Sequence, residues 1–371
     1  MIKKFVTPTL IAAGIALLLI GLPLLGAWLD GKPLRPFFTL TATPDLQPPA
    51  PFSWGAFVAV AAAILLVMGP FFRHLIRSQE PQPRPKRVST RRLPWWGRIG
   101  LMMLLVSWAL AWTRFPWFEP LQDQTFVPLW LSFILVVNGI THKRTGRCML
   151  THEPVYLIAL FAASPVFWWF FEYLNRFAAN WSYHAGHDEL LALNGQASLA
   201  FATVLPGVAS TCDLLATFPR LWAGMGRFVR IDIGAKPLAP LCLLLISAVA
   251  LVGIGIRPDL LYPFLWLSPL LLIVSVQQVA GYETVFSPLK SGNWSHLWLM
   301  AISALACGFF WEMWNMFSLA RWTYAIPYVG RFHVFEMPLL GYGGYLPFGL
   351  ECAVVCHGVR RLVRGGEGSA G

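Results

Sequence analysis

Three carboxylates within a strongly apolar stretch are the first candidates for chemistry in this sequence. Glu312, Glu336 and Glu351 lie in an aromatic-rich segment of a chain in which only 12% of the residues are charged. A carboxylate inside a membrane is costly, so it normally faces protein or a cavity and indicates a functional site. Glu312 has Met316 four residues on, so no cation neutralises it at helical spacing, and we expect it to act as an acid. A structural hydrogen bond between helices is the alternative interpretation.

A Glu-x-x-Asn pair occurs twice in the chain. Glu312 and Asn315 lie one helical turn apart, as do Glu172 and Asn175, so each pair shares a helix face. Asn315 is therefore predicted to act with Glu312 in catalysis. For the earlier pair, Arg176 follows Glu172 by four residues, which favours a structural ion pair near the membrane surface.

Further acids complete the candidate set. Glu336 begins an apolar run, where a helix N-terminus favours a carboxylate, and it is predicted to be the base or charge stabiliser. Helix capping alone would also explain Glu336. Asp213 and Glu351 lie nearer the opposite side of the membrane and predict an inner polar site, unless each meets a basic loop residue.

Aromatic side chains crowd around these acids. An interfacial aromatic belt needs no function and is one interpretation. The same density would suit a cavity for an apolar or cationic intermediate. The residues predicted to line such a substrate pocket are Trp311, Trp314, Trp322, Tyr324, Glu172 and Asn175.

Histidines beside the acids raise the question of a metal ion. Their spacing matches no zinc or iron motif, and a solvated loop is the favoured interpretation. The sequence contains no nucleotide-binding glycine motif and no haem attachment motif, so we predict no metal and no cofactor. The residues concerned are His184, His187, Asp188, Glu189 and His333.

The composition indicates which elements must hold these residues. The chain has 371 residues, of which 57% are hydrophobic and 15% aromatic, and its mean hydropathy is +0.59. A soluble chain would carry roughly 25% charged residues. We therefore predict an all-α polytopic membrane protein with about ten transmembrane helices. The net charge of +11 falls mainly in alternate loops, which indicates topology and not nucleic-acid binding. The six cysteines show neither a disulfide framework nor zinc spacing.

Apolar runs of the length that a bilayer requires, about 20 residues, divide the chain. Basic residues in alternate loops predict that both termini are cytoplasmic. We expect a multi-pass protein of the bacterial inner (plasma) membrane. The predicted spans are 5–29, 53–72, 99–113, 126–141, 154–175, 196–217, 239–256, 263–280, 296–319 and 334–357.

An internal repeat organises these spans. Trp130 and Trp266 stand 136 residues apart in matching runs, VPLWLSFILVV and PFLWLSPLLLIV. Glu172 and Glu312 stand 140 residues apart in runs that both continue to Trp-x-Tyr. The agreement predicts two parallel four-helix repeats, because an even number of helices per copy keeps the copies parallel. The expected domains are an N-terminal two-helix hairpin with a basic linker (1–96), a first repeat (97–237) and a second repeat with the tail (238–371).

The residues around Glu312 also suggest a family. Trp311-Glu312, then Trp322-Thr323-Tyr324, then an acid beside Pro338 resembles the integral-membrane lycopene cyclase domain. The family's acid pair follows its proline, whereas Glu336 precedes Pro338 here. The resemblance implies proton-initiated chemistry on a polyene or isoprenoid lipid, without a redox cofactor.

The sequence therefore predicts an integral membrane enzyme that acts on a hydrophobic lipid by carboxylate acid–base chemistry. The resemblance implies an isoprenoid or carotenoid substrate. A proton-coupled transporter with its site between the repeats is the main alternative, and a non-catalytic membrane scaffold is a third. The expected partner is a membrane lipid or another hydrophobic substrate, not nucleic acid. The sequence leaves the oligomeric state open.

Overall fold

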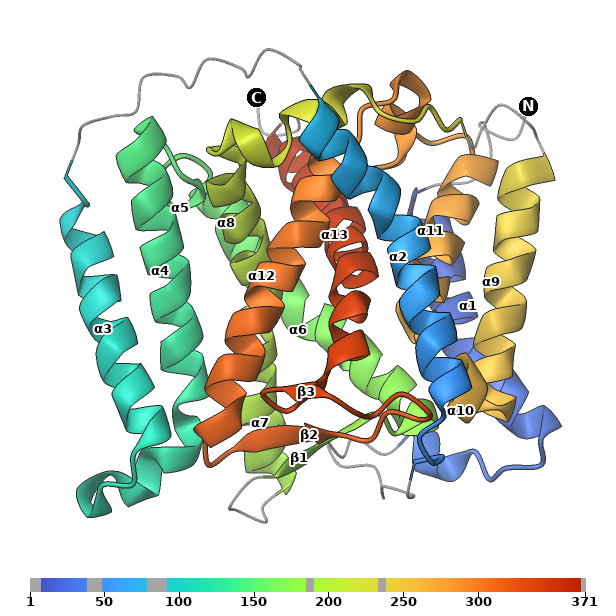
Figure 1. Ribbon diagram of the computed structural model, residues 1–371, viewed down its shortest axis with the longest axis horizontal. Helices are drawn as coiled ribbons and strands as arrows, with labels where there is room; N and C mark the ends of the chain where they lie inside the picture. Colours follow the sequence, from blue (N-terminus) through green and yellow to red (C-terminus); the bar gives the residue numbers. More distant parts are fainter. Residues whose placement is uncertain (1–7, 39–48, 79–91, 185–189, 233–237, 368–371) are drawn as a thin grey trace.

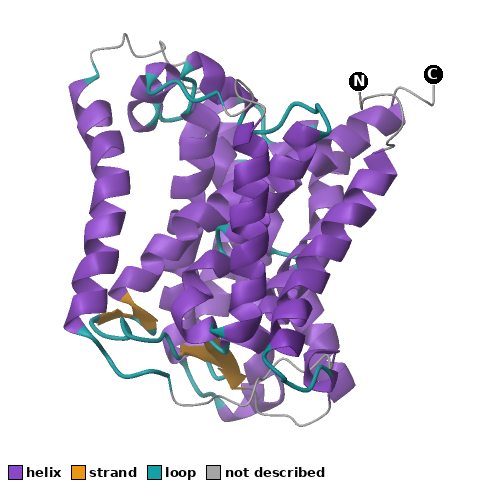
Figure 2. Cartoon of the chain, turned by 90° about the vertical axis from the view of Figure 1, so that its right-hand side faces the viewer, coloured by secondary structure: helices purple, strands orange, loops and turns teal. Residues whose placement is uncertain are grey.

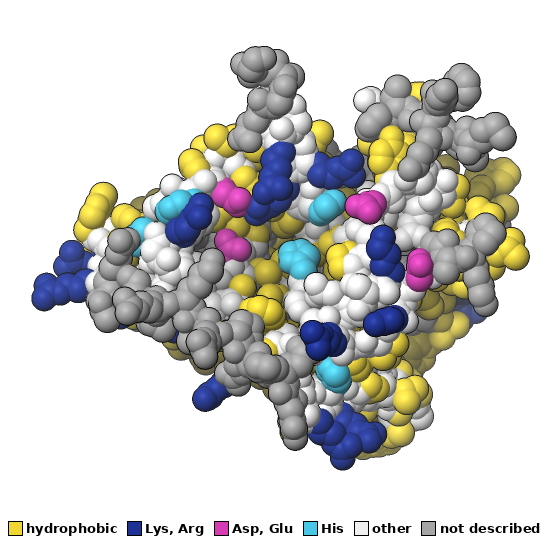
Figure 3. Space-filling model, turned by 90° about the horizontal axis from the view of Figure 1, so that it is seen from above, with side chains coloured by type: hydrophobic (Ala, Val, Ile, Leu, Met, Phe, Trp, Pro, Cys, Tyr) yellow, Lys and Arg dark blue, Asp and Glu magenta, His cyan; other side chains and the backbone are white. Residues whose placement is uncertain are grey.

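The protein is a bundle of long helices that run roughly side by side between two ends (Figure 1). The computed structural model describes residues 8–38, 49–78, 92–184, 190–232 and 238–367. The short strands gather at one end of the bundle, which we call the strand end (Figure 2). Basic side chains gather at the opposite end, which we call the basic end (Figure 3). The basic side chains near that end include Arg77, Arg144, Arg227, Lys290 and Arg364.

The main elements follow the predicted apolar runs closely. The α-helices are α1 (Pro8–Leu29), α2 (Trp54–Arg77), α3 (Trp95–Trp112), α4 (Phe126–Thr145), α5 (Met149–His152), α6 (Pro154–Ala178), α7 (Leu190–Phe201), α8 (Val204–Ala216), α9 (Leu238–Ile256), α10 (Pro258–Leu261), α11 (Ser268–Val279), α12 (Ser295–Phe317) and α13 (Tyr345–Glu367). The strands are β1 (Trp181–His184), β2 (Arg321–Tyr324), β3 (His333–Val334) and β4 (Met337–Pro338). The 3₁₀ segments that matter below are η3 (Pro116–Gln124), η5 (Ala223–Arg227), η6 (Tyr262–Leu265) and η8 (Leu339–Gly344).

The membrane spans confirm a polytopic helical protein and modify the expected number. In the part of the chain that the structure describes, nine helices are long and apolar enough to cross a membrane. The predicted span 263–280 is instead a broken segment, in which Pro258–Leu265 and Ser268–Val279 meet at 55°. Pro269 lacks the N–H that a continuous helix would donate to the carbonyl of Leu265, which accounts for a break at this point. The segment makes a tenth span only if its two parts are counted as one.

The bundle is built from helix pairs within each half of the chain and from contacts between the halves. α3 packs against α4, and α9 packs against α11. At the centre, α12 packs against α13 and α8, while α6 packs against α8 and α13. α6 and α8 come from the first half of the sequence and α12 and α13 from the second, so the core is shared between the halves.

The first two helices have different partners. α1 packs along α9, and their backbones approach so closely that a Cβ on Gly26 would overlap the carbonyl oxygen of Val252. Lys32 then donates hydrogen bonds to the last carbonyls of α9, those of Gly255 and Ile256 (2.9 and 3.2 Å). By contrast, α2 crosses the front of the molecule in Figure 1 and contacts mainly η5 and η8. The predicted N-terminal hairpin therefore consists of two helices that serve different parts of the bundle.

Strands β1 and β2 join the two halves at the strand end. They pair antiparallel, with Trp181 opposite Tyr324 and Tyr183 opposite Trp322. Because side chains alternate along a strand, these four aromatic side chains lie on one face of the ladder. The opposite face carries Ser182, His184, Arg321 and Thr323.

Candidate functional site

The carboxyl group of Glu172 lies in a cage of aromatic hydrogen-bond donors. Its Oε1 accepts hydrogen bonds from Trp168 Nε1 (2.8 Å), Trp181 Nε1 (3.1 Å) and the Tyr183 hydroxyl (2.6 Å). Trp168 lies one turn earlier on α6, whereas Trp181 and Tyr183 come from β1. Glu172 is only 3% exposed. The carboxyl group therefore holds the end of α6 to the strand that follows it.

This burial corrects one part of the sequence-based interpretation of Glu172, its location near the membrane surface. The charge of Arg176 still acts on the carboxyl group, but burial and the three donors act more strongly. An ion pair with Arg176 near the membrane surface would leave the carboxyl group partly in water. The structure instead places it in the interior, where three donors converge on one oxygen. A hydrogen-bond donor left unpaired in such a place costs about 1–3 kcal/mol, so this network is tightly constrained.

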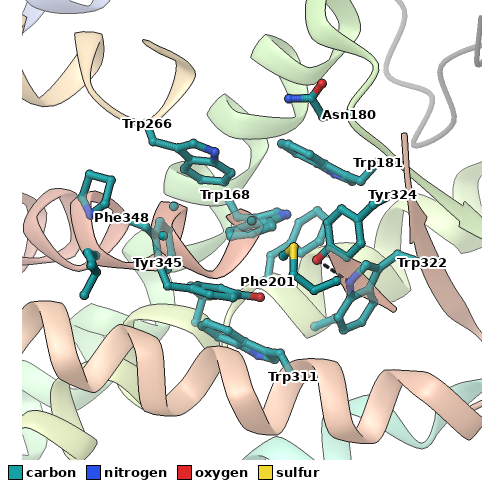
Figure 4. Close-up of a pocket in the computed structure, with 18 of the residues that line it drawn as sticks. Trp168, Asn180, Trp181, Phe201, Trp266, Trp311, Trp322, Tyr324, Tyr345 and Phe348 are labelled. Carbon is teal, nitrogen blue, oxygen red and sulfur yellow. Dashed lines mark hydrogen bonds between the residues drawn. The ribbon is translucent and has the colours of Figure 1, made fainter. Parts of the chain in front are cut away.

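Glu312 lies in a second cage with a different set of donors. Its Oε1 accepts hydrogen bonds from the hydroxyls of Tyr324 and Tyr345, both at 2.7 Å. Trp322 Nε1 donates to the Tyr324 hydroxyl (2.8 Å), which is the dashed contact in Figure 4. Glu312 is fully buried, and its Oε2 has no hydrogen-bond partner among the described residues. One carboxyl oxygen is thus held by two tyrosines, and the other has no hydrogen-bond partner in the described part of the chain.

The two asparagines fix the strands beneath the cages. Asn315 donates from Nδ2 to the carbonyl of Trp322 and accepts the Trp322 backbone N–H at Oδ1, both at 2.8 Å. Asn175 makes the same pair of contacts with the backbone of Trp181 (2.8 and 3.3 Å). Both asparagines are buried. The geometry thus assigns Asn315 to positioning Trp322 behind the cage, where the sequence predicted a catalytic role.

An apolar cavity of about 1360 Å³ opens on the inner side of these cages. The donor side chains line it, while Glu172 and Glu312 lie behind them. Figure 4 shows the aromatic rings of this region around a common space, with Tyr345 stacked over Trp311. The cavity therefore meets tyrosine hydroxyls and indole groups first, and reaches each carboxyl group through them. The labelled lining residues are Trp168, Asn180, Trp181, Phe201, Trp266, Trp311, Trp322, Tyr324, Tyr345 and Phe348.

The structure divides the predicted pocket residues into two groups. Trp311, Trp322 and Tyr324 line the cavity as expected. Trp314 does not, because it points into the core, where it packs against Trp130 with ring centroids 5.4 Å apart. Sequence reasoning missed Tyr345, which lies 33 residues from Glu312 and reaches it from the next span.

The tyrosines of the strands are held in their neutral form. Burial, followed by the charge of Glu312, raises the pKa of Tyr324 well above its ordinary value. Burial, followed by the charge of Glu172, does the same to the pKa of Tyr183. Both side chains therefore keep their hydroxyl protons at neutral pH.

The structure moves Glu336 away from the place that the sequence predicted. The helix begins only at Tyr345, and Glu336 lies in the turn between β3 and β4. Its side chain is 29% exposed and approaches Arg321 at 3.9 Å. Glu336 is therefore not a helix N-cap, because the short β3–β4 turn holds it, and it does not belong to the hydrogen-bonded cage of Glu312. It still lies close enough for its charge to act on Glu312.

The predicted inner polar site is not a single site. Asp213 lies towards the basic end of α8, where Arg360 and Glu153 are its charged neighbours. Glu351 is buried within α13, and the polar group that faces it is the backbone N–H of Leu270. The two acids thus have separate surroundings.

Of the residues in the histidine hypothesis, the structure describes His184 and His333. His187, Asp188 and Glu189 lie outside the described residues. His184 Nε2 lies 2.8 Å from the Thr323 hydroxyl on the neighbouring strand. Over the described ranges, no group of three or more His, Cys, Asp or Glu side chains could hold a metal ion.

The fold and the site define a polytopic membrane protein with an internal apolar cavity and buried carboxyls behind its tyrosines. Comparison of the chain with protein-family models, curated proteins and solved structures finds no match. The resemblance to the lycopene cyclase domain therefore stays a prediction.

Proposed function

We propose that this protein is a membrane-embedded enzyme that binds a long amphipathic lipid and transfers a proton to or from it at the Glu312 cage. The observation that carries the proposal is the shape and chemistry of the cavity. At about 1360 Å³ it exceeds the size of most small-molecule pockets, about 300–1,000 Å³. Its walls are mainly aliphatic and aromatic, which favours a hydrocarbon over a polar solute.

The cavity has the proportions of a lipid chain. On α12 its lining runs from Leu297 to Trp311, a distance of roughly 21 Å at 1.5 Å per residue. A bound chain would therefore lie along the helices, in the same direction as the surrounding lipid tails. The wall near the basic end consists of apolar groups such as Val67, Phe71 and Ala301.

The polar groups of the lining gather at the strand end. Asn180, Tyr183 and His184 come from β1 and the residue before it, and Arg321 and Tyr324 come from β2. This distribution orients an amphipathic ligand with its tail towards the basic end. The head or reactive group then lies beside the tyrosines of the two cages.

The proton chemistry follows from the hydrogen-bond order. With a proton on Oε1 of Glu312, the carboxyl group can donate to the hydroxyl oxygen of Tyr324, and the proton of Tyr324 is then directed to the ligand. When the ligand takes that proton, Tyr324 regains one from Glu312, which becomes a carboxylate. The Tyr324 hydroxyl lies 2.7 Å from Oε1, which supports a direct proton path between the two groups. Tyr345 offers a parallel route, because its hydroxyl meets the same oxygen.

The aromatic walls favour an isoprenoid substrate. Protonation of an alkene produces a carbocation, and cations are stabilised over aromatic faces by about 0.5–2 kcal/mol each. The rings of Trp311, Trp322 and Phe348 line the cavity beside the Glu312 cage. If Glu312 protonates a polyene in this position, the resulting carbocation would have aromatic faces on several sides.

A transporter is the second candidate, and α2 is the observation that favours it. None of the residues of α2 is buried, although Val60 to Phe71 line the cavity. The helix is fastened near its ends, where Ser53 N–H donates to the Tyr328 carbonyl (2.9 Å) and His74 Nε2 meets the Gly224 carbonyl (2.6 Å). A helix held in this way could open a lateral path to the bilayer.

We also propose that 97–237 and 238–357 are two copies related by an axis along the membrane normal. The β1–β2 register supports this, because Trp181 faces Tyr324 while its counterpart Trp322 faces Tyr183. The core supports it too. Trp130 packs on Trp311 of the other half (4.8 Å), and its counterpart Trp266 packs on Phe171 (5.0 Å).

The basic end is proposed to face the cytoplasm, in an inner membrane, by the positive-inside rule. In a cysteine-free background, Lys143→Cys and Lys290→Cys should resist an impermeant thiol reagent in intact cells. Arg331→Cys, at the strand end, should react. The reverse pattern would invert the orientation.

The lipid proposal is tested by what the purified protein retains. Mass spectrometry of an organic extract should find a prenyl or polyene lipid in excess over bulk phospholipid. Ala301→Trp, which fills the tail end of the cavity, should remove it. Val249→Trp is the matched control, because Val249 is exposed on the lipid side of α9. Loss of the lipid in both variants, or retention in both, would contradict binding in the cavity. A polar solute in its place would favour the transporter.

A further inference from the structure

The carboxyl group of Glu351 is buried in α13 without a side-chain partner. Glu351 is 4% exposed, and neither Oε1 nor Oε2 makes a hydrogen bond within the described chain. The backbone N–H of Leu270 interacts with this carboxyl group without reaching hydrogen-bond geometry. An unpaired carboxylate in such a place costs several kcal/mol, so the group needs a ligand.

The break between η6 and α11 explains why a backbone N–H is available there. Leu270 lies in the first turn of α11, where N–H groups have no partner within the helix. Pro269 precedes it and contributes no donor of its own. The first turn of a helix also carries partial positive charge. Because of the break, the partly positive first turn of α11 faces the carboxyl group of Glu351, well inside the membrane.

The corresponding place in the first copy is fully satisfied. Leu205-Pro206 of α8 corresponds to Leu346-Pro347 of α13, so Ser210 takes the position of Glu351. Asn138 Nδ2 lies 2.9 Å from the Ser210 hydroxyl oxygen and donates to it. Asn138 Oδ1 accepts the backbone N–H of Leu150 (3.1 Å). The first copy therefore needs no ligand at this position.

The second copy has lost that partner and gained an acid. By the spacing of Trp130 and Trp266, the counterpart of Asn138 is Val274, a buried aliphatic residue of α11. Val274 can neither donate to Glu351 nor coordinate an ion. A metal cation is further disfavoured, because the positive end of α11 faces the carboxyl group.

The titratable groups around Glu351 are thiols. Cys352 is adjacent on α13, and Cys307 of α12 and Cys356 surround Cys352 in turn. Among the described residues, no charged side chain lies against the Glu351 carboxyl group. A proton is therefore the ligand that this environment can supply.

We infer that Glu351 is a proton-binding site in the membrane interior, separate from the lipid cavity. In one state the carboxyl group carries the proton. In the other it has passed the proton to water, and the carboxylate accepts the Leu270 N–H at the start of α11. The inference rests on the duplication proposed above and not on lipid chemistry, so it can fail while the lipid proposal holds.

Carbodiimide labelling tests the site directly. Dicyclohexylcarbodiimide is apolar and adds to protonated carboxyl groups, and peptide mass spectrometry locates the adduct. In the purified protein, we expect an adduct at Glu351 that falls at least about tenfold between pH ~5 and ~9, since each pH unit changes protonation by up to tenfold. Labelling of other acids with none at Glu351 at any pH would overturn the inference.

Infrared difference spectroscopy across the same pH range provides a readout that does not depend on reagent access. The carbonyl stretch of a protonated carboxyl should lose one component in Glu351→Gln and keep it in Glu312→Gln. The double variant Glu351→Ser with Val274→Asn rebuilds the pair of the first copy, so it should fold normally and lack the same component. An unchanged spectrum in both Glu351 variants would overturn the site.

Discussion

The cages around Glu172 and Glu312 are built on the same sequence pattern, but different hydrogen-bond donors reach the two carboxyl groups. In each, an asparagine one turn later fixes a strand, and the strand brings a tyrosine to the carboxyl group. The difference lies at one helix position. Trp168 donates to Glu172, whereas the residue 140 positions later is Gly308.

Gly308 makes room for a donor from another helix. A Cβ at this position would lie 2.5 Å from the ring of Tyr345. Tyr345 therefore occupies the space that an indole fills in the first cage, and its hydroxyl reaches Glu312. The first carboxyl group receives three donors on one oxygen, while the second keeps Oε2 unpaired. We infer that the first cage is chiefly structural and that the second is reactive.

The largest expected effect separates the two carboxyls by function. Glu312→Gln keeps the shape and the acceptor oxygen but removes the transferable proton. Conversion of the co-purifying lipid should fall by about 10²-fold or more, the usual contribution of a general acid. Glu172→Gln should retain most of the activity at equal membrane abundance. Near-normal turnover in both variants would make both acids structural, and the reaction site would then have to be sought at Asp213 or Glu351.

The next effect concerns stability, and here substitution of Glu172 should cost more than substitution of Glu312. Glu172→Ala leaves Trp168, Trp181 and Tyr183 without an acceptor, at about 1–3 kcal/mol for each buried donor. Glu312→Ala leaves only the hydroxyls of Tyr324 and Tyr345. We expect the first variant to be less stable by at least about 1 kcal/mol, as measured by denaturation in detergent. Equal stabilities would remove the distinction between a structural and a reactive cage.

A smaller effect tests Gly308, the residue that makes the second cage different from the first. Gly308→Ala should push Tyr345 away from Glu312 and destabilise the protein by about 1–3 kcal/mol, as overpacking does in other cores. Gly14→Ala in α1 is the matched control, because nothing lies within 4 Å of its added Cβ. If Gly308→Ala loses no more stability than the control, the absence of a Cβ at Gly308 is not what allows Tyr345 to reach Glu312.

The smallest effect is expected at Glu336. Its contact with Arg321 is long and partly exposed, and such pairs contribute about 0–1 kcal/mol. Glu336→Gln should therefore change the free energy of unfolding by no more than about 1 kcal/mol and leave turnover nearly unchanged. A loss of activity comparable to that of Glu312→Gln would return Glu336 to the reactive site.

Local patterns in the sequence were enough to predict several parts of this arrangement. Glu172 with Asn175, and Glu312 with Asn315, share helix faces because a turn of helix is about 3.6 residues, and the structure confirms that each pair is buried together. The Trp-x-Tyr motifs were recognised in both halves, although their pairing as β1 and β2 was not predicted. The helix predicted from residue 334 was wrong at its start, because β3, β4 and η8 occupy 333–344.

Contacts distant in sequence escaped prediction. The position of Tyr345 beside Glu312 depends on how α13 packs against α12, and no spacing within either helix encodes it. The use of α2 as a wall of the cavity was equally invisible, since its composition is that of any membrane span.

The sequence by itself determined that the chain crosses a membrane many times, because hydropathy and helix length are local properties that the bilayer selects. It also determined that Glu312 and Glu351 lie in apolar surroundings, but it did not determine that Glu172 does. Only the tertiary structure decided which of them keeps an unpaired oxygen. The donors to Glu172 come from α6 and the adjoining β1, whereas those to Glu312 come from β2 and from α13. The number of donors that reach a buried acid depends on the packing of those separate elements, and that number distinguishes the two cages.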